Sequence, residues 1–221
     1  MVKLATSMMV ASPFKLAHQI DTIDHETDLY HVDLMDGHYV PNIAQSIDFV
    51  NQLKPFATKN VEVHLMVAEA EKFIDRLPLE SIETLIFHRD TIEQPISVLS
   101  TLLRQKNVKL GIALSPKDPV ALVADDLEWI DQVTVMTVEP GFAGQQMIPE
   151  VLPKISELKA LKEHSNHSFL IEVDGSNNFE TFEAYIQRGA DILILGSTLF
   201  SYDPISEGYH TIKQFIKRLK P

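Results

Sequence analysis

Two histidines and two aspartates stand in or at the end of short apolar runs of this sequence. His31 and Asp33 are two positions apart, so in a strand their side chains point to the same side, roughly 6–7 Å from each other. His64 ends a second apolar run and Asp174 follows a third. Strands do not carry such groups for stability alone, because burying polar side chains is costly. If the three strands meet, two imidazoles and two carboxylates suit one divalent metal ion per chain: Zn²⁺, Mn²⁺, Fe²⁺ or Co²⁺, among which the ligand set does not choose.

Each of these residues taken singly is more often a satisfied polar group than a ligand. Four candidates near the ends of separate strands together favour a site. Asp36 and His38 lie beyond the strand, where we expect a turn or a supporting role. His88, at the end of a further apolar run, is a weaker candidate.

Glycine-bearing segments follow three later apolar runs. They are Gly141-Phe142-Ala143-Gly144, Gly175-Ser176 and Gly196-Ser197. A single glycine is more often a turn residue, but adjacent loops of this kind can present backbone N–H groups to an anion. The sequence therefore predicts a phosphate site made of backbone dipoles, without a basic patch.

Eight apolar runs alternate with amphipathic stretches along the chain. The runs are Lys3–Met9, Tyr30–Leu34, Val61–Leu65, Thr84–Phe87, Lys109–Leu114, Gln132–Met136, Phe169–Val173 and Asp191–Leu195, and examples of the stretches are Ile96–Gln105, Pro149–Leu161 and Phe179–Arg188. This pattern predicts the α/β class and one compact (β/α)₈ TIM barrel that occupies residues 1–221 as a single domain. The main alternative is a doubly wound open sheet, which is weakened because no run is followed by a G-x-G-x-x-G or P-loop pattern. In a barrel, the carboxyl ends of distant strands meet at one mouth, where all four candidate ligands would lie.

Charge and composition limit the partners. The chain has 19 basic and 31 acidic residues and a formal net charge of −12, which argues against nucleic acids and anionic membranes as partners. It has no cysteine, so it has neither a thiol nucleophile nor a Cys-type zinc site. The N-terminal apolar run is too short for a signal peptide, and we expect a cytoplasmic protein.

A metal ion beside two carboxylates, with a phosphate anchor across the site, suits proton abstraction next to a carbonyl. One carboxylate would remove the proton and the other would return it from the opposite face, which inverts a stereocentre. Met35, Met66 and Met136, near strand ends, are core fillers or an apolar floor around the reacting carbon. Two other functions stay open: an aldol cleavage or isomerisation, and non-catalytic binding of a sugar phosphate. A Schiff-base aldolase would need a lysine at a strand end, and none of the eight runs ends in one.

Five segments resemble the ribulose-phosphate 3-epimerase family in order and spacing, over essentially the whole chain. They are residues 31–42 (HVDLMDGHYVPN), 64–67 (HLMV), 135–145 (VMTVEPGFAGQ), 172–176 (EVDGS) and 196–197 (GS). The resemblance implies a TIM barrel that epimerises C3 of a ketose phosphate through an enediolate, and it implies a homo-oligomer.

The same resemblance implies roles for individual residues. His31, Asp33, His64 and Asp174 would bind the metal, and the two aspartates would also act as acid and base. The implied substrate-binding residues are Ser7, His64, Met35, Met66, Met136, Gly141, Phe142, Ala143, Gly144, Asp174, Gly175, Ser176, Gly196 and Ser197.

Three positions depart from the usual pattern of the family. Thr6 stands where the family usually has proline, and Ala143 and Ser176 stand where it usually has glycine. The segments around Ala143 and Ser176 look like the D-allulose-6-phosphate 3-epimerase branch. We therefore expect a slight preference for D-allulose 6-phosphate and D-fructose 6-phosphate, with D-ribulose 5-phosphate and D-xylulose 5-phosphate of the pentose phosphate pathway as the alternative pair.

Overall fold

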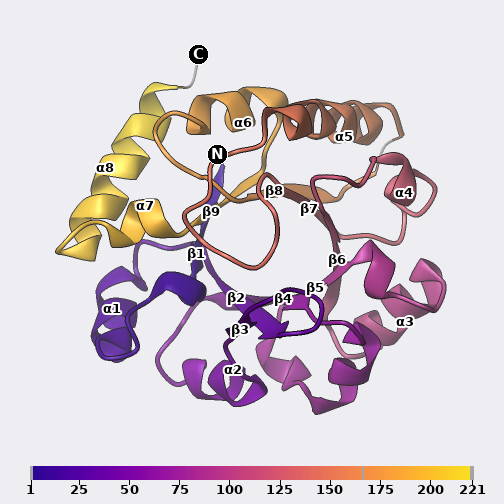
Figure 1. Ribbon diagram of the computed structural model, residues 1–221, viewed down its shortest axis with the longest axis horizontal. Coiled ribbons are helices and arrows are strands. Elements are labelled where there is room, and N and C mark those ends of the chain that lie inside the picture. The colour runs from indigo at the N-terminus through magenta and orange to yellow at the C-terminus, as the bar shows by residue number, and fades with distance from the viewer. Residues whose placement is uncertain (1, 166, 220–221) are drawn as a thin grey trace.

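Eight parallel strands close into a barrel, as the alternation of apolar runs predicts. The computed structural model describes residues 2–165 and 167–219. Around the ring the order is β1, β9, β8, β7, β6, β5, β4 and β2, and pairing of β1 with β2 closes it (Figure 1). The barrel strands are β1 (Lys3–Ser7), β2 (Leu29–Asp36), β4 (Asn60–Met66), β5 (Thr84–His88), β6 (Lys109–Leu114), β7 (Gln132–Met136), β8 (Leu170–Asp174) and β9 (Ile192–Leu195). The predicted single-domain TIM barrel is confirmed.

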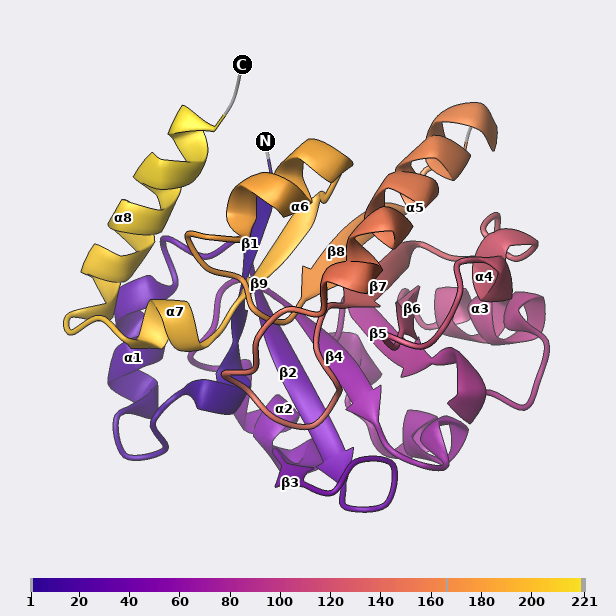
Figure 2. The same ribbon diagram turned by 45° about the horizontal axis from the view of Figure 1, so that its top comes forward.

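Helices surround the ring and cover its outer face (Figures 1 and 2). The α-helices are α1 (Leu16–Ile23), α2 (Ile47–Leu53), α3 (Ile96–Gln105), α4 (Ala121–Ala124), α5 (Leu152–Ser165), α6 (Phe182–Arg188), α7 (Ser197–Phe200) and α8 (Ile205–Arg218). Short 3₁₀ helices complete the connections: η1 (Met8–Val10), η2 (Ala70–Arg76), η3 (Leu79–Ser81), η4 (Arg89–Thr91) and η5 (Pro149–Val151). Within the described ranges, no helix combines the length and apolar character needed to cross a membrane.

Two predicted helix starts differ from the structure. The stretch expected to be helical from Pro149 begins as the 3₁₀ helix η5, and α5 follows it to Ser165. The stretch expected from Phe179 becomes helical only at Phe182, because side chains hold the preceding turn. There Thr181 Oγ1 accepts the N–H of Asn178 at 3.1 Å, a local bond that competes with the helix.

Two strand ends also differ from the prediction. The first run was expected to reach Met9, but β1 ends at Ser7, whose hydroxyl accepts the N–H of Met9 at 3.4 Å and so caps η1. Asp36 was expected in a loop beyond the second strand, but it is the last residue of β2. A short antiparallel strand, β3 (Ile43–Ala44), pairs with this end of β2 and extends it.

Alternation along β4 separates an apolar outer face from a polar inner face. In β4, Val63 and Leu65 face the helices and belong to the main core, whereas Glu62 and His64 point into the barrel. The register between β2 and β4 sets Asp33 beside His64. The apolar face therefore holds the helices on, and the inner face brings the site residues together.

We expect Leu103→Ala to lower the free energy of unfolding by about 2–5 kcal/mol, because Leu103 in α3 is fully buried. Leu102→Ala is the matched control: it makes the same change in the same helix at a side chain that is 37% exposed, and should cost less than about 1 kcal/mol. Urea denaturation of the two variants measures both values. Equal losses would show that α3 does not pack on the barrel as described.

Candidate functional site

The four candidate metal ligands come from three strands and meet inside the barrel, although His31 and Asp33 lie within β2 and not at its end. His31 and Asp33 come from β2, His64 from β4 and Asp174 from β8. One ligand atom from each lies within 4.8 Å of the others. The two histidines are fully buried, and Asp174 is the most exposed of the four, with 18% of its side chain accessible. The structure thus brings together the set that the sequence proposed.

Asp33 is the centre of this cluster. Its Oδ1 lies 3.2 Å from His31 Nε2 and 3.3 Å from His64 Nδ1, and the Ser7 hydroxyl donates to its Oδ2 at 3.4 Å. Asp174 Oδ2 approaches His64 Nδ1 at 3.8 Å. In the part of the chain that the structure describes, His64 Nδ1 is buried and makes no hydrogen bond. A buried nitrogen that faces two carboxylates without a hydrogen bond fits a metal ligand, so this cluster could hold a divalent ion.

The two aspartates differ in their affinity for a proton. Burial alone would raise the pKa of Asp33, but the charge and hydrogen bond of His31, followed by the approach of His64, hold it well below its usual range. Burial and then the negative charge of Asp33 raise the pKa of Asp174. Two carboxylates whose pKa values are pushed apart are the arrangement expected of a base and an acid.

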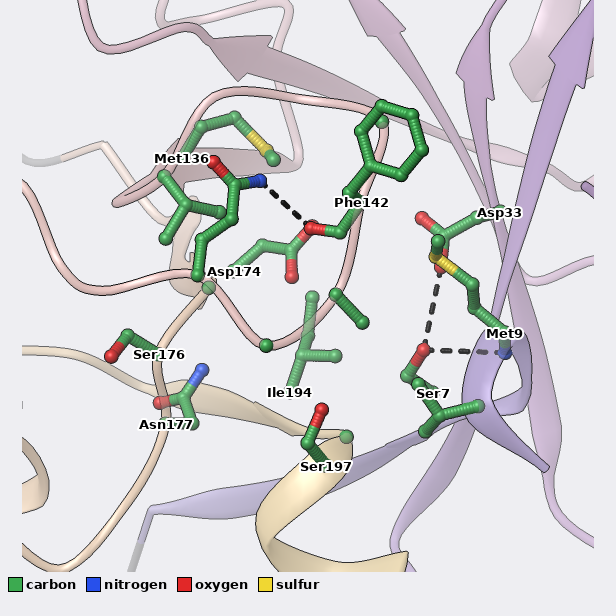
Figure 3. A pocket seen from close by; sticks show the side chains of 18 of the residues that line it. Ser7, Met9, Asp33, Met136, Phe142, Asp174, Ser176, Asn177, Ile194 and Ser197 are labelled. Carbon is green, nitrogen blue, oxygen red and sulfur yellow. Dashed lines mark hydrogen bonds between the residues drawn. The ribbon is translucent and has the colours of Figure 1, made fainter. Parts of the chain in front are cut away.

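A cavity of about 250 Å³ lies over this cluster. Asp33 and Asp174 project into it from opposite sides, and Ser7, Met136, Phe142 and Ser197 line its wall (Figure 3). Every residue expected to bind substrate lines the cavity except His64, which is buried beneath it. Lining residues that the sequence did not single out are Met9, Val10, Val138, Glu139, Gln145, Asn177, Asn178, Ile194 and Thr198.

The loops predicted to bind phosphate line this cavity. The loop after β7 arches over the end of the ring (Figure 1), and the Asn42 side-chain amide donates to the Gly141 carbonyl at 2.7 Å. Gly144 approaches the loop after β9, because a Cβ on it would lie 3.9 Å from Ser197 Oγ. Gly175 and Ser176 both have positive φ values, 107° and 45°, which turn the loop after β8 sharply. The three loops therefore surround one space.

A buried polar network beneath the cluster was not predicted. Glu62 Oε1 lies 2.7 Å from His31 Nδ1, and the Gln132 amide donates to both Glu62 and Glu172 at 3.0 Å. Burial raises the pKa of Glu172, and the charge of Glu62 raises it further. The signal was present in the sequence: Glu62 and Glu172 each stand two positions before a site residue on the same strand, and therefore face the same way.

The structure also shows where three residues lie for which the sequence supported only a minor role. Asp36 accepts the N–H groups of His38 and Tyr39 through Oδ1, at 2.8 and 2.9 Å, and that of Ala68 through Oδ2, so it shapes the loop and is not part of the cluster. His38 is exposed on that loop. His88 is fully buried beside His64 and does not line the cavity.

Comparison with known sequences identifies the family. The model of the family described as "Ribulose-phosphate 3 epimerase family" matches residues 3–200. The chain belongs to this family. A Bacillus subtilis relative named ribulose-phosphate 3-epimerase is 35% identical over 202 residues, which cover 90% of this chain and 93% of the relative. A relative of the same name from Methanocaldococcus jannaschii is 32% identical over 215 residues, 97% of this chain and 91% of the relative.

Family membership makes this protein an epimerase, and therefore an isomerase. The slight preference expected for allulose 6-phosphate finds no support, because these relatives are named for ribulose phosphate and favour the alternative pair. The names of these relatives therefore do not support the six-carbon substrate that Ala143 and Ser176 suggested.

Solved structures with little sequence similarity share the fold. Orotidine 5′-monophosphate decarboxylase from Sulfolobus solfataricus has a TM-score of 0.68 at 14% identity, with 99% of each chain covered. Thiamine phosphate pyrophosphorylase from Pyrococcus furiosus has a TM-score of 0.62 at 8% identity, covering 100% of this chain and 98% of the other. These likenesses concern the barrel alone.

We expect Gly175→Ala to destabilise the protein more than Gly144→Ala. Both glycines have positive φ, 107° and 78°, so alanine costs about 1–2 kcal/mol of backbone strain at either. Only at Gly175 would the new Cβ also overlap its surroundings, at 2.7 Å from Val138 Cγ2 and 2.8 Å from Thr137 Oγ1, which adds about 1–3 kcal/mol. Denaturant midpoints measure the difference, and equal stability of the two variants would contradict this packing.

Proposed function

We propose that this epimerase interconverts D-ribulose 5-phosphate and D-xylulose 5-phosphate by inverting C3. The observation that carries the proposal is the pair of aspartates, Asp33 and Asp174, which face each other across a cavity closed by glycine-bearing loops. The names of the relatives support the five-carbon substrate. A sugar-phosphate-binding barrel without catalysis would have no use for two carboxylates of opposed proton affinity.

The two aspartates would divide the proton transfer between them. Asp33, whose pKa is held low, would take the C3 proton from one face of the sugar and leave an enediolate. Asp174, whose pKa is raised, would give a proton to C3 on the opposite face. In the reverse direction the roles exchange, because the two carboxyls have then exchanged their protonation states.

His31, Asp33, His64 and Asp174 would hold a divalent metal ion. When bound, such an ion supplies Lewis-acid chemistry, which makes the proton next to a carbonyl more acidic. His31 and His64 would present ring nitrogens from the buried side, and the aspartates would present oxygens from the cavity side. Zn²⁺, Mn²⁺, Fe²⁺ and Co²⁺ all accept this ligand set.

The remaining cavity residues would orient the substrate. Backbone groups at Gly175–Ser176, Gly196–Ser197 and Gly141–Gly144 would bind the phosphate. Met35, Met66 and Met136 would form an apolar floor that keeps water from the reacting carbon. Ser7, bonded to Asp33, would contact the sugar.

We also propose that copies of this chain associate, as family resemblance suggests. Phe14, Ile43 and Phe56 are large apolar side chains that are 98%, 79% and 57% exposed. Exposed apolar groups of this size are typical of surfaces that another protein covers.

The direct test compares two substrates with the protein loaded in turn with each of the four metals. We expect turnover of ribulose 5-phosphate to exceed that of allulose 6-phosphate, and both the product and the recovered substrate to carry deuterium at C3 when the reaction runs in deuterated water. Faster turnover of allulose 6-phosphate would reverse the substrate assignment. No labelling at C3 of either sugar with any metal would refute the proposed chemistry.

Asp33→Asn and Asp174→Asn should each lower kcat by about 10²–10⁴-fold, since each removes one proton-transfer group. Asp36→Asn is the matched control on the same strand as Asp33, because its carboxylate binds loop N–H groups and an amide oxygen can accept two of them. We expect its kcat to stay within about tenfold of the parent value, which is a smaller loss than the range of about 10²–10⁴-fold expected for the other two variants. Metal content and circular dichroism of each variant separate loss of chemistry from loss of metal or fold. Near-parental turnover in either of the first two variants would remove that residue from the acid or base role.

A further inference from the structure

His88 has a place in the structure that the proposed chemistry does not use. It is the last residue of β5, which neighbours β4 in the barrel (Figure 1), and it is fully buried. Its Nε2 lies 3.0 Å from Nε2 of His64, and the two ring planes differ by 25° with their centroids 5.0 Å apart, so the rings meet edge to edge. On its other side, His88 Nδ1 lies 3.2 Å from the Ser115 hydroxyl. Three buried polar side chains thus form a line that starts at the cluster and leads away from the cavity.

Hydrogen-bond chemistry gives this line a direction. Of two imidazole nitrogens 3.0 Å apart, one must carry a proton and the other must offer a lone pair. His64 Nδ1 faces Asp33 and Asp174 and makes no hydrogen bond among the residues described, so as a ligand it must offer its lone pair there. The proton of a neutral His64 then lies on Nε2 and is donated to His88. His88 in turn carries its own proton on Nδ1 and donates it to Ser115.

We propose that His88 is a positioning residue, which holds His64 in the Nε2–H tautomer with its Nδ1 lone pair aimed into the cluster, and that Ser115 orients His88. This inference rests on the proposed metal-dependent function, since it concerns a proposed ligand. Residues that hold the second nitrogen of a metal-bound histidine fix both its ring orientation and its tautomer.

Two further contacts support the assignment. Tyr39 packs against the ring of His88, with ring centroids 4.8 Å apart, and its hydroxyl donates to Asp90 at 3.0 Å, so the His88 ring has little room to turn. The other histidine of the cluster is held in the opposite sense: Nδ1 of His31 lies 2.7 Å from Glu62, which leaves Nε2 to face Asp33. Each histidine of the cluster therefore has one nitrogen fixed by a residue outside it.

The test is the affinity for Zn²⁺, measured by competition with a chromophoric chelator. We expect His88→Phe, which keeps a ring but cannot accept a hydrogen bond, to bind Zn²⁺ about 10–100-fold more weakly than the parent. The amide oxygen of the His88→Gln variant can accept from His64, so this variant should bind Zn²⁺ within about threefold of the parent. That loss is smaller than the range of about 10–100-fold expected when such a partner is removed. A merely structural role of His88 would not produce this rescue. Parental affinity in His88→Phe, or equal losses in both variants, would overturn the assignment.

Two serines provide a matched pair that perturbs the fold less. Ser115→Ala removes the acceptor for His88, whereas Ser100→Ala removes a hydroxyl that is equally buried and bonds the Trp129 carbonyl at 2.7 Å, far along the chain from the cluster. We expect Ser115→Ala to weaken Zn²⁺ binding several-fold and Ser100→Ala to leave it unchanged. If His88→Phe fails to fold, this pair still decides: equal affinities of the two serine variants would overturn the role of the line.

Long-range ¹H–¹⁵N spectra of the zinc-loaded protein, labelled at histidine, read the tautomers directly. We expect the proton of His64 on Nε2 and that of His88 on Nδ1, and a proton on Nδ1 of His64 would refute the inference. A parent protein that binds none of the four metals would refute the metal site of the proposed function and this inference with it. A parent that binds Zn²⁺ while His88→Phe binds it equally well would refute the positioning role alone.

Discussion

The carboxylate of Asp33 has almost no contact with water, and the interior of the barrel depends on how its charge is compensated. Only 4% of this residue is exposed, and a buried carboxylate is tolerated only when it is paired and hydrogen-bonded. His31 and His64 both approach its Oδ1, and Ser7 donates to its Oδ2. These partners favour the ionised form of Asp33, and that charge in turn makes it harder to ionise Asp174. Burial raises the pKa of Asp174 and the charge of Asp33 raises it further, so two chemically identical side chains differ in proton affinity.

The same compensation reaches across the barrel below the cavity. His31 of β2 contacts Glu62 of β4, and Gln132 of β7 bridges Glu62 to Glu172 of β8. Glu172 stands two residues before Asp174, so the network joins the strand of one catalytic candidate to the strand of the other. Such a network is most rigid when every group is satisfied, and here Glu172 Oε1 makes no hydrogen bond among the residues described. The network therefore connects the strands of the two aspartates from beneath, while the apolar outer face of the strands holds the helices in place.

The barrel and the main residues of the site could be predicted from the sequence because both follow from alternation along single strands. The same alternation shows that Glu62 and Glu172 face inward, but their contacts with Gln132 could not be predicted, because they depend on the register between strands, which no single run specifies. His88 is a weak candidate in the sequence for the same reason, because its role depends on a nitrogen of His64 on the neighbouring strand. Asp36 was misplaced because its side chain does form a turn, as expected, while its backbone also pairs with β3 and prolongs the strand.

The motif variants that favoured a six-carbon sugar have a local physical explanation. Ser176 has a φ of 45°, in the left-handed region where glycine is preferred, and its hydroxyl accepts from the Asn178 amide at 3.2 Å. A local hydrogen bond of this kind lets a residue other than glycine occupy that conformation. Ser176 therefore reports how the loop backbone is held. In the proposed function, the length of sugar that fits would depend on the distance from the two aspartates to the loops that bind the phosphate, and anchors such as the bond from Asn42 to Gly141 help to set where one of those loops lies.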